Sequence, residues 1–407
     1  MQFSVAASGT NRLIGMAKIM RLAFNGDDLS SSTASLTQRI QADSQDAAAL
    51  MDLSIVLQLK GRPRLAIELQ TEALQLNQFF ELDSEPKQPA IKLLVIMGPG
   101  EVMANTPIEF LVEESDIELS FLYLGEGLPI PNKIPQHDLA FVAVCESDQS
   151  QYLLAQLASV MRLWPKPFIN SPARIADLSR NRVSERLASA KGITASCARR
   201  LNRLQTQNID FQSSSNGNPF PVIARPVNSH AGHGLCKLDD CDQVDEYLAT
   251  HDSDEFFVAP FIDYRSSDGL FRKYRIAVID GQPFAAHMAI SRHWMVHYLN
   301  ADMHSNAKNR DAEAEFMSNF DSDFGARHRR SLAEIDRRMG LDYYSIDCAE
   351  TPDGKLLVFE LDTGAVVHSM DSVELFPYKA PQMESVYAAF REMLRTRVSR
   401  RMKRKAA

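Results

Sequence analysis

The sequence contains no long hydrophobic run. Its best candidates, 93–97 and 139–145, have the length of a strand, whereas a bilayer-spanning helix needs about 18 consecutive apolar residues. The first residues also lack the basic start and apolar block of a secretory signal, because Arg12 and Lys18 interrupt the stretch 13–20. We therefore expect no membrane association and a cytoplasmic location.

Cysteine is scarce as well, with five residues in a chain of 407. The cysteines are scattered, their number is odd, and no two have the CxxC spacing of a metal-binding or redox pair. A disulfide framework and a cysteine-based zinc site are therefore not expected. Reduced thiols of this kind are typical of cytoplasmic proteins.

Neither sign of charge dominates. The chain has 44 Lys and Arg against 52 Asp and Glu, a formal net charge of −8, which disfavours a general nucleic-acid binder. Its hydrophobic fraction of 45% is that of a globular protein, and its length leaves room for two or three domains. The strongly basic tail, 396–407, is predicted to be a solvated end, with contact to an acidic partner or nucleic acid as the alternative.

Two apolar stretches at helical spacing, 47–59 and 65–76, flank a break at Gly61-Arg62-Pro63. This pattern resembles one tetratricopeptide unit, and we assign 1–85 to a helical extension of that type. A single unit cannot close a solenoid, so it is expected to cap its neighbour, with a partner-docking surface as the alternative. The polar run 27–35 is predicted to be a loop.

After a polar linker at 81–89, strand-like and helical segments alternate, which is typical of a parallel α/β layer. The predicted strands are 91–97, 117–124, 139–145 and 167–170, and the predicted helices are 102–114 and 151–164. We assign 90–170 to this α/β domain.

The remaining segment, 171–395, is predicted to begin with an arginine-rich helical stretch at 171–206 and to become strand-rich afterwards. The predicted strands are 222–227, 256–262, 274–279, 283–290, 343–348 and 356–361. Four histidines are expected to contact substrate or a lid, with ordinary packing or a histidine metal site as the alternatives: His287, His293, His297 and His304.

Three carboxylates are predicted to share one sheet face. Asp353-Gly354 is a hairpin signal, and a two-residue turn there places Asp347 opposite Glu360, with Asp362 on the same face. A hard cation such as Mg²⁺ would relieve their repulsion. An exposed acidic face is the alternative, which the apolar neighbours 356–359 disfavour, and a register slip of one residue would undo the site.

A second hairpin signal, Asp280-Gly281, joins the strand-like segments 274–279 and 282–290, and cationic candidates lie on this hairpin or beside it. Lys273 and Arg275 share one strand face, so Arg275 can make a bidentate contact with a phosphate or carboxylate. Arg292 follows the next strand, and ordinary surface charge is the alternative for these residues.

The order of these features resembles the ATP-grasp superfamily, in the branch of glutathione synthetase and the ribosomal-protein glutamate ligases. The segments that carry the resemblance are 168–172, 192–194, 220–226 with 228–234, 273–281, and 346–347 with 353–354 and 358–362. The resemblance covers about residues 90–395 and implies an ATP-grasp fold of two α+β lobes, preceded by an α/β domain and the helical extension.

The resemblance also implies site residues. Those expected to contact ATP are Arg182, Arg225, His230, Gly232, Gly234, Ala259, Phe261 and Asp263. Those expected to hold Mg²⁺ are Asp347, Glu360 and Asp362. Those expected to hold the acyl phosphate or substrate carboxylate are Arg275, Arg292 and Asn300.

The sequence departs from the family's pattern at three places. Arg182 and Arg225 stand where the family has lysines, Asp362 stands where it has asparagine, and 363–368 replaces a run of small residues. A guanidinium keeps the charge of a lysine but is larger and planar. These differences predict either an unusual pocket for the acceptor substrate or a reduced turnover.

The resemblance implies an ATP- and Mg²⁺-dependent carboxylate–amine ligase that works through an acyl phosphate. Its substrates would be a small-molecule carboxylate and an amine, or a peptide or protein. Two alternatives stay open: a nucleotide-binding scaffold that has lost catalysis and acts through its helical extension, and a phosphotransferase on the same fold. A homodimer and a protein partner on the helical extension are further expectations, and no nucleic-acid partner is expected.

Overall fold

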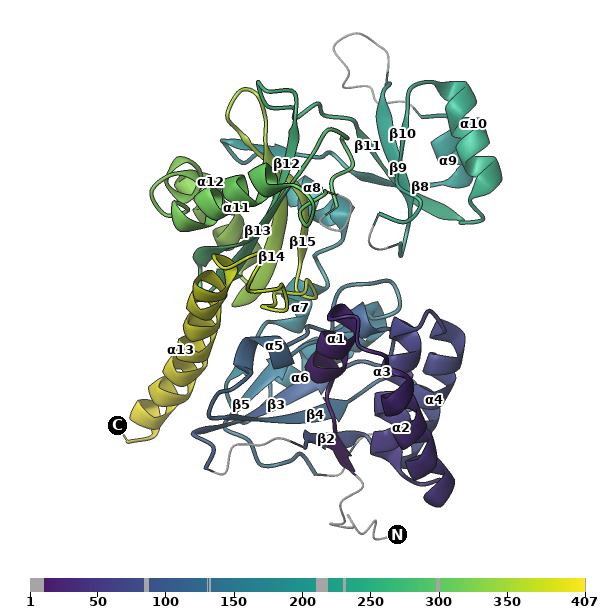
Figure 1. Ribbon diagram of the computed structural model, residues 1–407, viewed down its shortest axis with the longest axis vertical. Coiled ribbons are helices and arrows are strands. Elements are labelled where there is room, and N and C mark those ends of the chain that lie inside the picture. Colours follow the sequence, from purple (N-terminus) through teal and green to yellow (C-terminus); the bar gives the residue numbers. More distant parts are fainter. Residues whose placement is uncertain are drawn as a thin grey trace. The chain divides into compact units, whose positions relative to one another are not determined.

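The computed structural model describes residues 11–83, 88–129, 131, 133–209, 219–229, 232–297 and 301–406, with side chains up to residue 400. The chain forms two compact units of mixed α/β structure (Figure 1). The first unit runs up to Ala176 and also takes Thr363–Ser372 and the chain from Met383 onward. The second unit comprises Asp177–Asp362 and Val373–Gln382. The predicted helical extension and α/β layer therefore lie in one unit.

Four helices follow the first short strand of the first unit. They are α1 (Met16–Phe24), α2 (Ser30–Ala42), α3 (Ala47–Leu59) and α4 (Pro63–Leu76). The two predicted helices are confirmed as α3 and α4. Proline at the first position of α4 costs no hydrogen bond, because the first amides of a helix have no intrahelical partner.

The loop predicted over 27–35 is wrong beyond Leu29, because α2 occupies most of it. The Asp28 side chain accepts a hydrogen bond of 2.8 Å from the first helical amide, as an Asp before a helix often does. Leu36 is almost fully buried in a cluster with Leu53 of α3. Ile40 of α2 packs against the same cluster, so apolar tertiary contacts hold a polar sequence in a helix.

In the described part of the first unit, six strands form one sheet in the order β1-β2-β4-β3-β5-β6. They are β1 (Arg12–Leu13), β2 (Phe79–Leu82), β3 (Ile91–Met97), β4 (Ile117–Tyr123), β5 (Leu139–Val142) and β6 (Phe168–Ile169). Strands β3 to β6 pair in parallel, which confirms the predicted α/β layer. Strand β2 pairs antiparallel with β4, so the predicted linker at 81–89 begins inside a strand.

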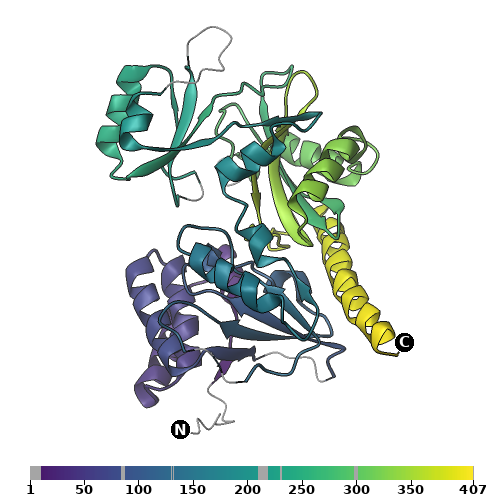
Figure 2. The same ribbon diagram turned by 180° about the vertical axis from the view of Figure 1, so that it is seen from behind.

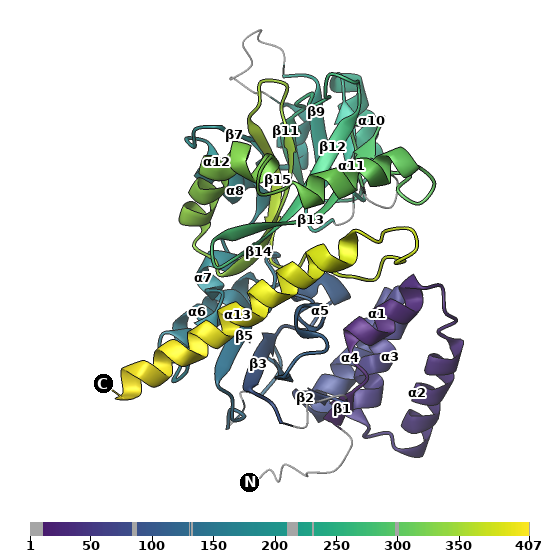
Figure 3. The ribbon, with the colours of Figure 1, turned by 60° about the vertical axis from the view of Figure 1, so that its left-hand side comes forward.

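Helices cover this sheet. Helix α6 (Gln151–Met161) lies over the strands in Figure 2 and buries three leucines and a methionine. Helix α13 (Lys379–Ala406) crosses β3 and β5 in Figure 3. The ring of Phe390 on this helix lies 6.0 Å from the ring of Phe141 on β5. The single helix predicted over 102–114 is wrong in part, because the structure has only a 3₁₀ turn at Val102–Ala104 and the short helix α5 (Glu109–Val112) there.

The second unit contains two sheets in its described part. The four-stranded sheet has the order β10-β9-β11-β8 and the five-stranded sheet the order β13-β12-β14-β15-β7. The strands of the first are β8 (Arg199–Asn202), β9 (Val222–Pro226), β10 (Cys236–Leu238) and β11 (Glu255–Pro260). Those of the second are β7 (Ile193–Ala195), β12 (Phe271–Ile279), β13 (Gln282–Ser291), β14 (Tyr343–Glu350) and β15 (Leu356–Asp362).

Helices accompany each sheet, so each sheet forms an α+β lobe. They are α8 (Arg180–Leu187), α9 (Arg203–Gln207), α10 (Cys241–Thr250), α11 (Ala307–Ser318) and α12 (Phe324–Met339). The prediction of helix throughout 171–206 is wrong in part. Strand β7 adds in parallel to the edge of β15, and β8 pairs with β11, so pairing with distant segments overrides the local pattern. No helix among the described residues is long and apolar enough to cross a membrane.

Candidate functional site

The β14–β15 hairpin brings the predicted carboxylates together. Asp347 lies opposite Glu360, and Asp362 lies opposite Ser345, so all three carboxylates share one face. The turn differs from the prediction, because Glu350 pairs with Leu356, whereas a two-residue turn would pair it with Leu357. A register shift beside Asp347 restores the predicted pair, so the two departures cancel.

Polar side chains form a row across four strands of the same sheet. Arg275 of β12 lies opposite His287 of β13 on one side and opposite Asp347 on the other. With Glu360 opposite Asp347, the row reads His287, Arg275, Asp347, Glu360 from β13 to β15. Directly paired residues point to the same side of a sheet, so this row is one continuous polar surface.

Asp347 is held by two cations. Its oxygens accept hydrogen bonds of 2.7 and 2.9 Å from Nε and Nη2 of Arg275, and Nζ of Lys273 lies 2.6 Å away. The Asp347 side chain is only 2% exposed. Burial alone would raise the pKa of Asp347, but the charges of Arg275 and Lys273 hold this pKa far below its ordinary value. Asp347 is therefore ionised.

Glu360 is held by a cation from another element. The Arg180 guanidinium of α8 donates a hydrogen bond to a Glu360 carboxylate oxygen. Burial opposes ionisation, yet the neighbouring Arg180 charge lowers the pKa of Glu360. Burial, and next the nearby charge of Arg180, lower the pKa of Arg225 on β9 to about 10. The charge of Glu360 also acts on Arg225, so Arg225 belongs to the same cluster. Four cations from three distant segments thus surround two carboxylates.

The structure places Arg182 away from this cluster. Its Nη1 lies 3.2 Å from Asp177, and half of its side chain is exposed. Arg180 takes the place at the site because residues two apart on a helix point in different directions. Val183 and Leu187 are buried on α8, and Arg180 precedes them by three and seven residues, so helical periodicity could have identified Arg180 from the sequence.

Two predicted ATP contacts, Arg225 and Gly234, shape the loop after β9. The Arg225 guanidinium donates to both the hydroxyl group and the backbone carbonyl of Ser229. Gly234 has a φ of +67°, and a Cβ there would come within 2.7 Å of Pro226. Gly232 also has a positive φ, of +77°. Two predicted residues, His230 and Asn300, lie outside the described residues.

The four-stranded sheet has one apolar face and one mixed face. Alternate residues, including Val222, Ala224 and Val258, enter the buried core. The pairs between strands place two rows on the opposite face. These rows are Lys237, Ile223 and Ala259, and next to them Arg225, Phe257 and Arg200.

Three predicted ATP contacts, Ala259, Phe261 and Asp263, lie at the end of β11 or just beyond it. Ala259 is buried, and the half-buried Phe261 ring lies 5.7 Å from the Trp294 ring in an edge-to-face arrangement. Asp263 is exposed and paired with Arg265, whose hydrogen bonds lower the pKa of Asp263. Arg292 is also exposed, just beyond β13. The structure thus brings Ala259 and Phe261 to the mixed face, whereas Asp263 and Arg292 lie at the surface.

The Mg²⁺ site of Asp347, Glu360 and Asp362 stays a prediction. Oxygen donors on one face suit Mg²⁺, but no group of three or more His, Cys, Asp or Glu side chains within the described ranges could hold a metal ion. Lys273 and Arg275 engage Asp347, and Arg180 engages Glu360. Protein cations thus lie beside two of the three carboxylates that the prediction assigned to Mg²⁺.

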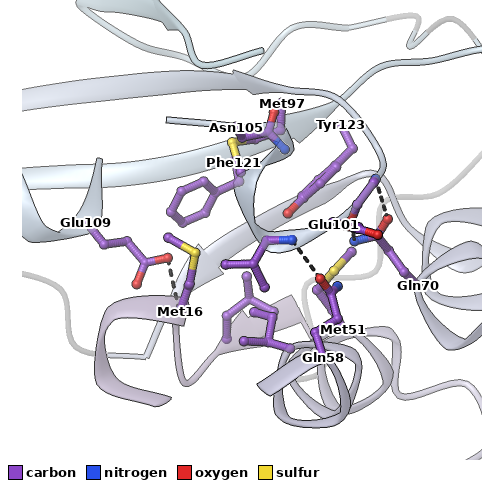
Figure 4. Close-up of a pocket in the computed structure, with 14 residues that line it drawn as sticks. Met16, Met51, Gln58, Gln70, Met97, Glu101, Asn105, Glu109, Phe121 and Tyr123 are labelled. Atoms are coloured by element: carbon purple, nitrogen blue, oxygen red, sulfur yellow. Dashed lines mark hydrogen bonds between the residues drawn. The ribbon is translucent and has the colours of Figure 1, made fainter. Parts of the chain in front are cut away.

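The first unit contains a small cavity between the helical segment and the sheet (Figure 4). The Gln58 side-chain oxygen accepts from the Val102 amide at 2.6 Å, and Gln70 exchanges two hydrogen bonds with the Gly100 backbone. The cavity measures about 40 Å³, enough for a water molecule and too small for a substrate. Helices α3 and α4 thus brace the loop after β3, which favours the capping role.

Comparisons with known proteins give structural likenesses only. No family model matches the sequence, and no curated protein matches it. A D-alanine–D-alanine ligase from Bacillus anthracis in complex with ATP is 17% identical, over 76% of this chain and 98% of that one, with a TM-score of 0.47. A RimK domain ATP-grasp protein from Sphaerobacter thermophilus is 16% identical, over 74% and 98%, with a TM-score of 0.43. A D-Ala:D-Ser ligase from Enterococcus faecalis is 12% identical, over 74% and 100%, also with a TM-score of 0.43.

Proposed function

We propose that the second unit binds ATP on the polar faces of its two sheets and uses it for carboxylate–amine ligation. The observation that carries this proposal is the cluster of Arg180, Arg225, Lys273 and Arg275 around Asp347 and Glu360. Such a cluster suits a polyphosphate whose charge must be held in a fixed geometry. The motif order and the two α+β lobes support an ATP-grasp organisation.

The cations of this cluster keep donors for an anionic ligand. Arg275 uses Nε and Nη2 for Asp347, which leaves its Nη1 group. Because Asp347 fixes both Arg275 and Lys273, these cations are held in place before a ligand binds. Such preorganisation lowers the free energy that would otherwise be spent on ordering long side chains.

The proposed reaction has two steps. A substrate carboxylate oxygen attacks the γ-phosphorus of ATP, the bond from phosphorus to the bridging oxygen breaks, and ADP leaves with that electron pair. The amine nitrogen then attacks the acyl carbon, the bond from carbon to the phosphate oxygen breaks, and inorganic phosphate leaves while the nitrogen loses a proton. Arg275, Lys273 and Arg225 would stabilise the charge on the transferring phosphoryl group and on the acyl phosphate.

We place the adenine base of ATP on the mixed face of the four-stranded sheet. Ile223, Ala259 and Phe261 offer an apolar surface beside Arg225. A flat base can pack on such a surface while the arginine meets the phosphates. The substrates would be a small carboxylate and an amine, or a peptide, and the homodimer and the protein partner remain predictions.

The experiment is a product analysis. Purified protein is incubated with Mg·ATP and a panel of amino acids and peptides, and ADP, phosphate and new amides are measured by mass spectrometry. The proposed ligase releases equal amounts of ADP and phosphate together with an amide. Nucleotide binding without ADP across the panel would instead indicate a scaffold, and a stable phosphorylated product without free phosphate would indicate a phosphotransferase.

A further inference from the structure

Lys237 lies on the mixed face of the four-stranded sheet. On β10 it pairs with Ile223 of β9, which pairs in turn with Ala259 of β11. The next residue, Leu238, points the other way and is buried in the core. Since side chains alternate along a strand, Lys237 belongs to the surface proposed for the base.

The ammonium group of Lys237 is held near the end of β11. It lies 5.0 Å from the centre of the Phe261 ring and 2.6 Å from an Asp239 carboxylate oxygen. Its side chain is only 27% exposed, while that of Asp239 is 53% exposed. An ammonium group above an aromatic ring and beside a carboxylate has few accessible positions, so its place is set before a ligand binds.

We propose that Lys237 is a further nucleotide-contacting residue, which donates a hydrogen bond from Nζ to an acceptor atom of the adenine base or its ribose. This inference rests on the proposed function. Lys237 shares its row with Ala259, whereas Arg225 belongs to the neighbouring row with Phe257. Lys237 therefore contacts the nucleoside part of ATP, and Arg225 contacts the phosphates.

The chain offers a matched control for this lysine. Lys355, in the turn between β14 and β15, pairs with Asp353 at 2.7 Å, also two residues away along the chain. Its side chain is 51% exposed, and Asp353 is 59% exposed. Lys355→Met therefore removes the same type of ion pair from a turn with no role in the proposed nucleotide surface.

The test measures dissociation constants for ATP and AMP by isothermal titration calorimetry. Lys237→Met should raise the dissociation constants of both nucleotides by a similar factor of about ten. This factor corresponds to the loss of one good hydrogen bond from a charged donor. Lys237→Arg should recover most of this loss, and Lys355→Met should change either constant less than twofold. Thermal unfolding of each variant shows whether the fold is kept.

The outcomes separate this inference from the proposed function. If the wild-type chain binds neither nucleotide, the proposed function fails. If the wild type binds ATP and folded Lys237→Met binds it equally well, the assignment of Lys237 is overturned. A loss confined to ATP, with AMP unchanged, also overturns it, because the contact would then be to the terminal phosphates.

Discussion

Asp347 and Glu360 lie directly opposite each other on β14 and β15, although the turn that joins their strands is longer than the hairpin signal predicts. A register shift beside Asp347 brings the two residues back into line. Each of the two carboxylates is held by cations from other elements, Lys273 and Arg275 of β12 and Arg180 of α8. The pair is therefore part of a charge network that ties α8, β12, β14 and β15 together.

Replacing Asp347 should destabilise the fold strongly. Asp347→Asn leaves Lys273 and Arg275 without their buried carboxylate, and breaking such a pair costs about 3–5 kcal/mol. Urea unfolding followed by circular dichroism measures this change. The control is Asp353→Asn, whose exposed ion pair with Lys355 should contribute less than about 1 kcal/mol. Equal stability of the two variants would contradict the proposed network.

Two arginines of α8 should differ sharply in their effect on ATP use. Arg180→Met removes the cation bound to Glu360, so we expect ATP turnover to fall at least about tenfold. Arg182→Met removes a half-exposed contact with Asp177 and should reduce turnover less than about threefold, the size of a surface ion pair. Steady-state release of ADP measures both. The reverse order would restore the assignment that the family resemblance implies.

Nucleotide binding should depend only weakly on divalent metal. Lys273, Arg275 and Arg180 already supply positive charge at Asp347 and Glu360. We therefore expect the dissociation constant for ATP in EDTA to lie within about threefold of its value with Mg²⁺, a difference below about 1 kcal/mol. Calorimetric titration under the two conditions measures this ratio. A loss of more than tenfold in EDTA would mean that the carboxylates bind a metal after the cations move away.

Stability of the first unit should fall as the pH rises toward neutrality. Asp52 of α3 is fully buried and accepts a hydrogen bond of 2.8 Å from the Ile14 amide. Burial raises its pKa to about 7, so the folded chain binds a proton there that the unfolded chain has released above about pH 4. The stabilisation from this protonated group is complete below pH 4. It is lost as the pH rises from about 4 to 7.

Glu109 adds to this effect. It accepts hydrogen bonds from the Met16 and Ala17 amides, and burial raises its pKa to about 7 as well. Asp52→Asn removes one titrating group. The free energy of unfolding of this variant, relative to that of the wild type, should therefore rise between pH 5 and pH 8 by up to about 3 kcal/mol. Urea unfolding at the two pH values measures the change. Glu68→Gln, at an exposed position of α4, should show no such trend, and a flat difference for Asp52→Asn would contradict the assignment.

Much of the fold was predictable because local pattern carries it. The apolar period in 47–59 matches α3, and the apolar run 91–97 matches β3. Alternation of strands and helices predicted the parallel pairing of β3 with β4 and β5. The pair Asp347 and Glu360 was also predicted, but from a turn that the chain does not adopt.

By itself, the sequence determined which segments could form helices and strands and which residues could carry charge in one sheet face. Periodicity encodes these properties, because side chains repeat every 3.6 residues in a helix and every two in a strand. Tertiary structure decided the rest: α2 forms over a polar run because Leu36 is buried, and β7 and β8 form by pairing with distant strands. It also decided that Arg180 binds Glu360 while Arg182 contacts Asp177, and that Lys273 and Arg275 neutralise Asp347. Which charges meet depends on strand register and on the direction of each helix face, and both are set by packing between segments far apart in the chain.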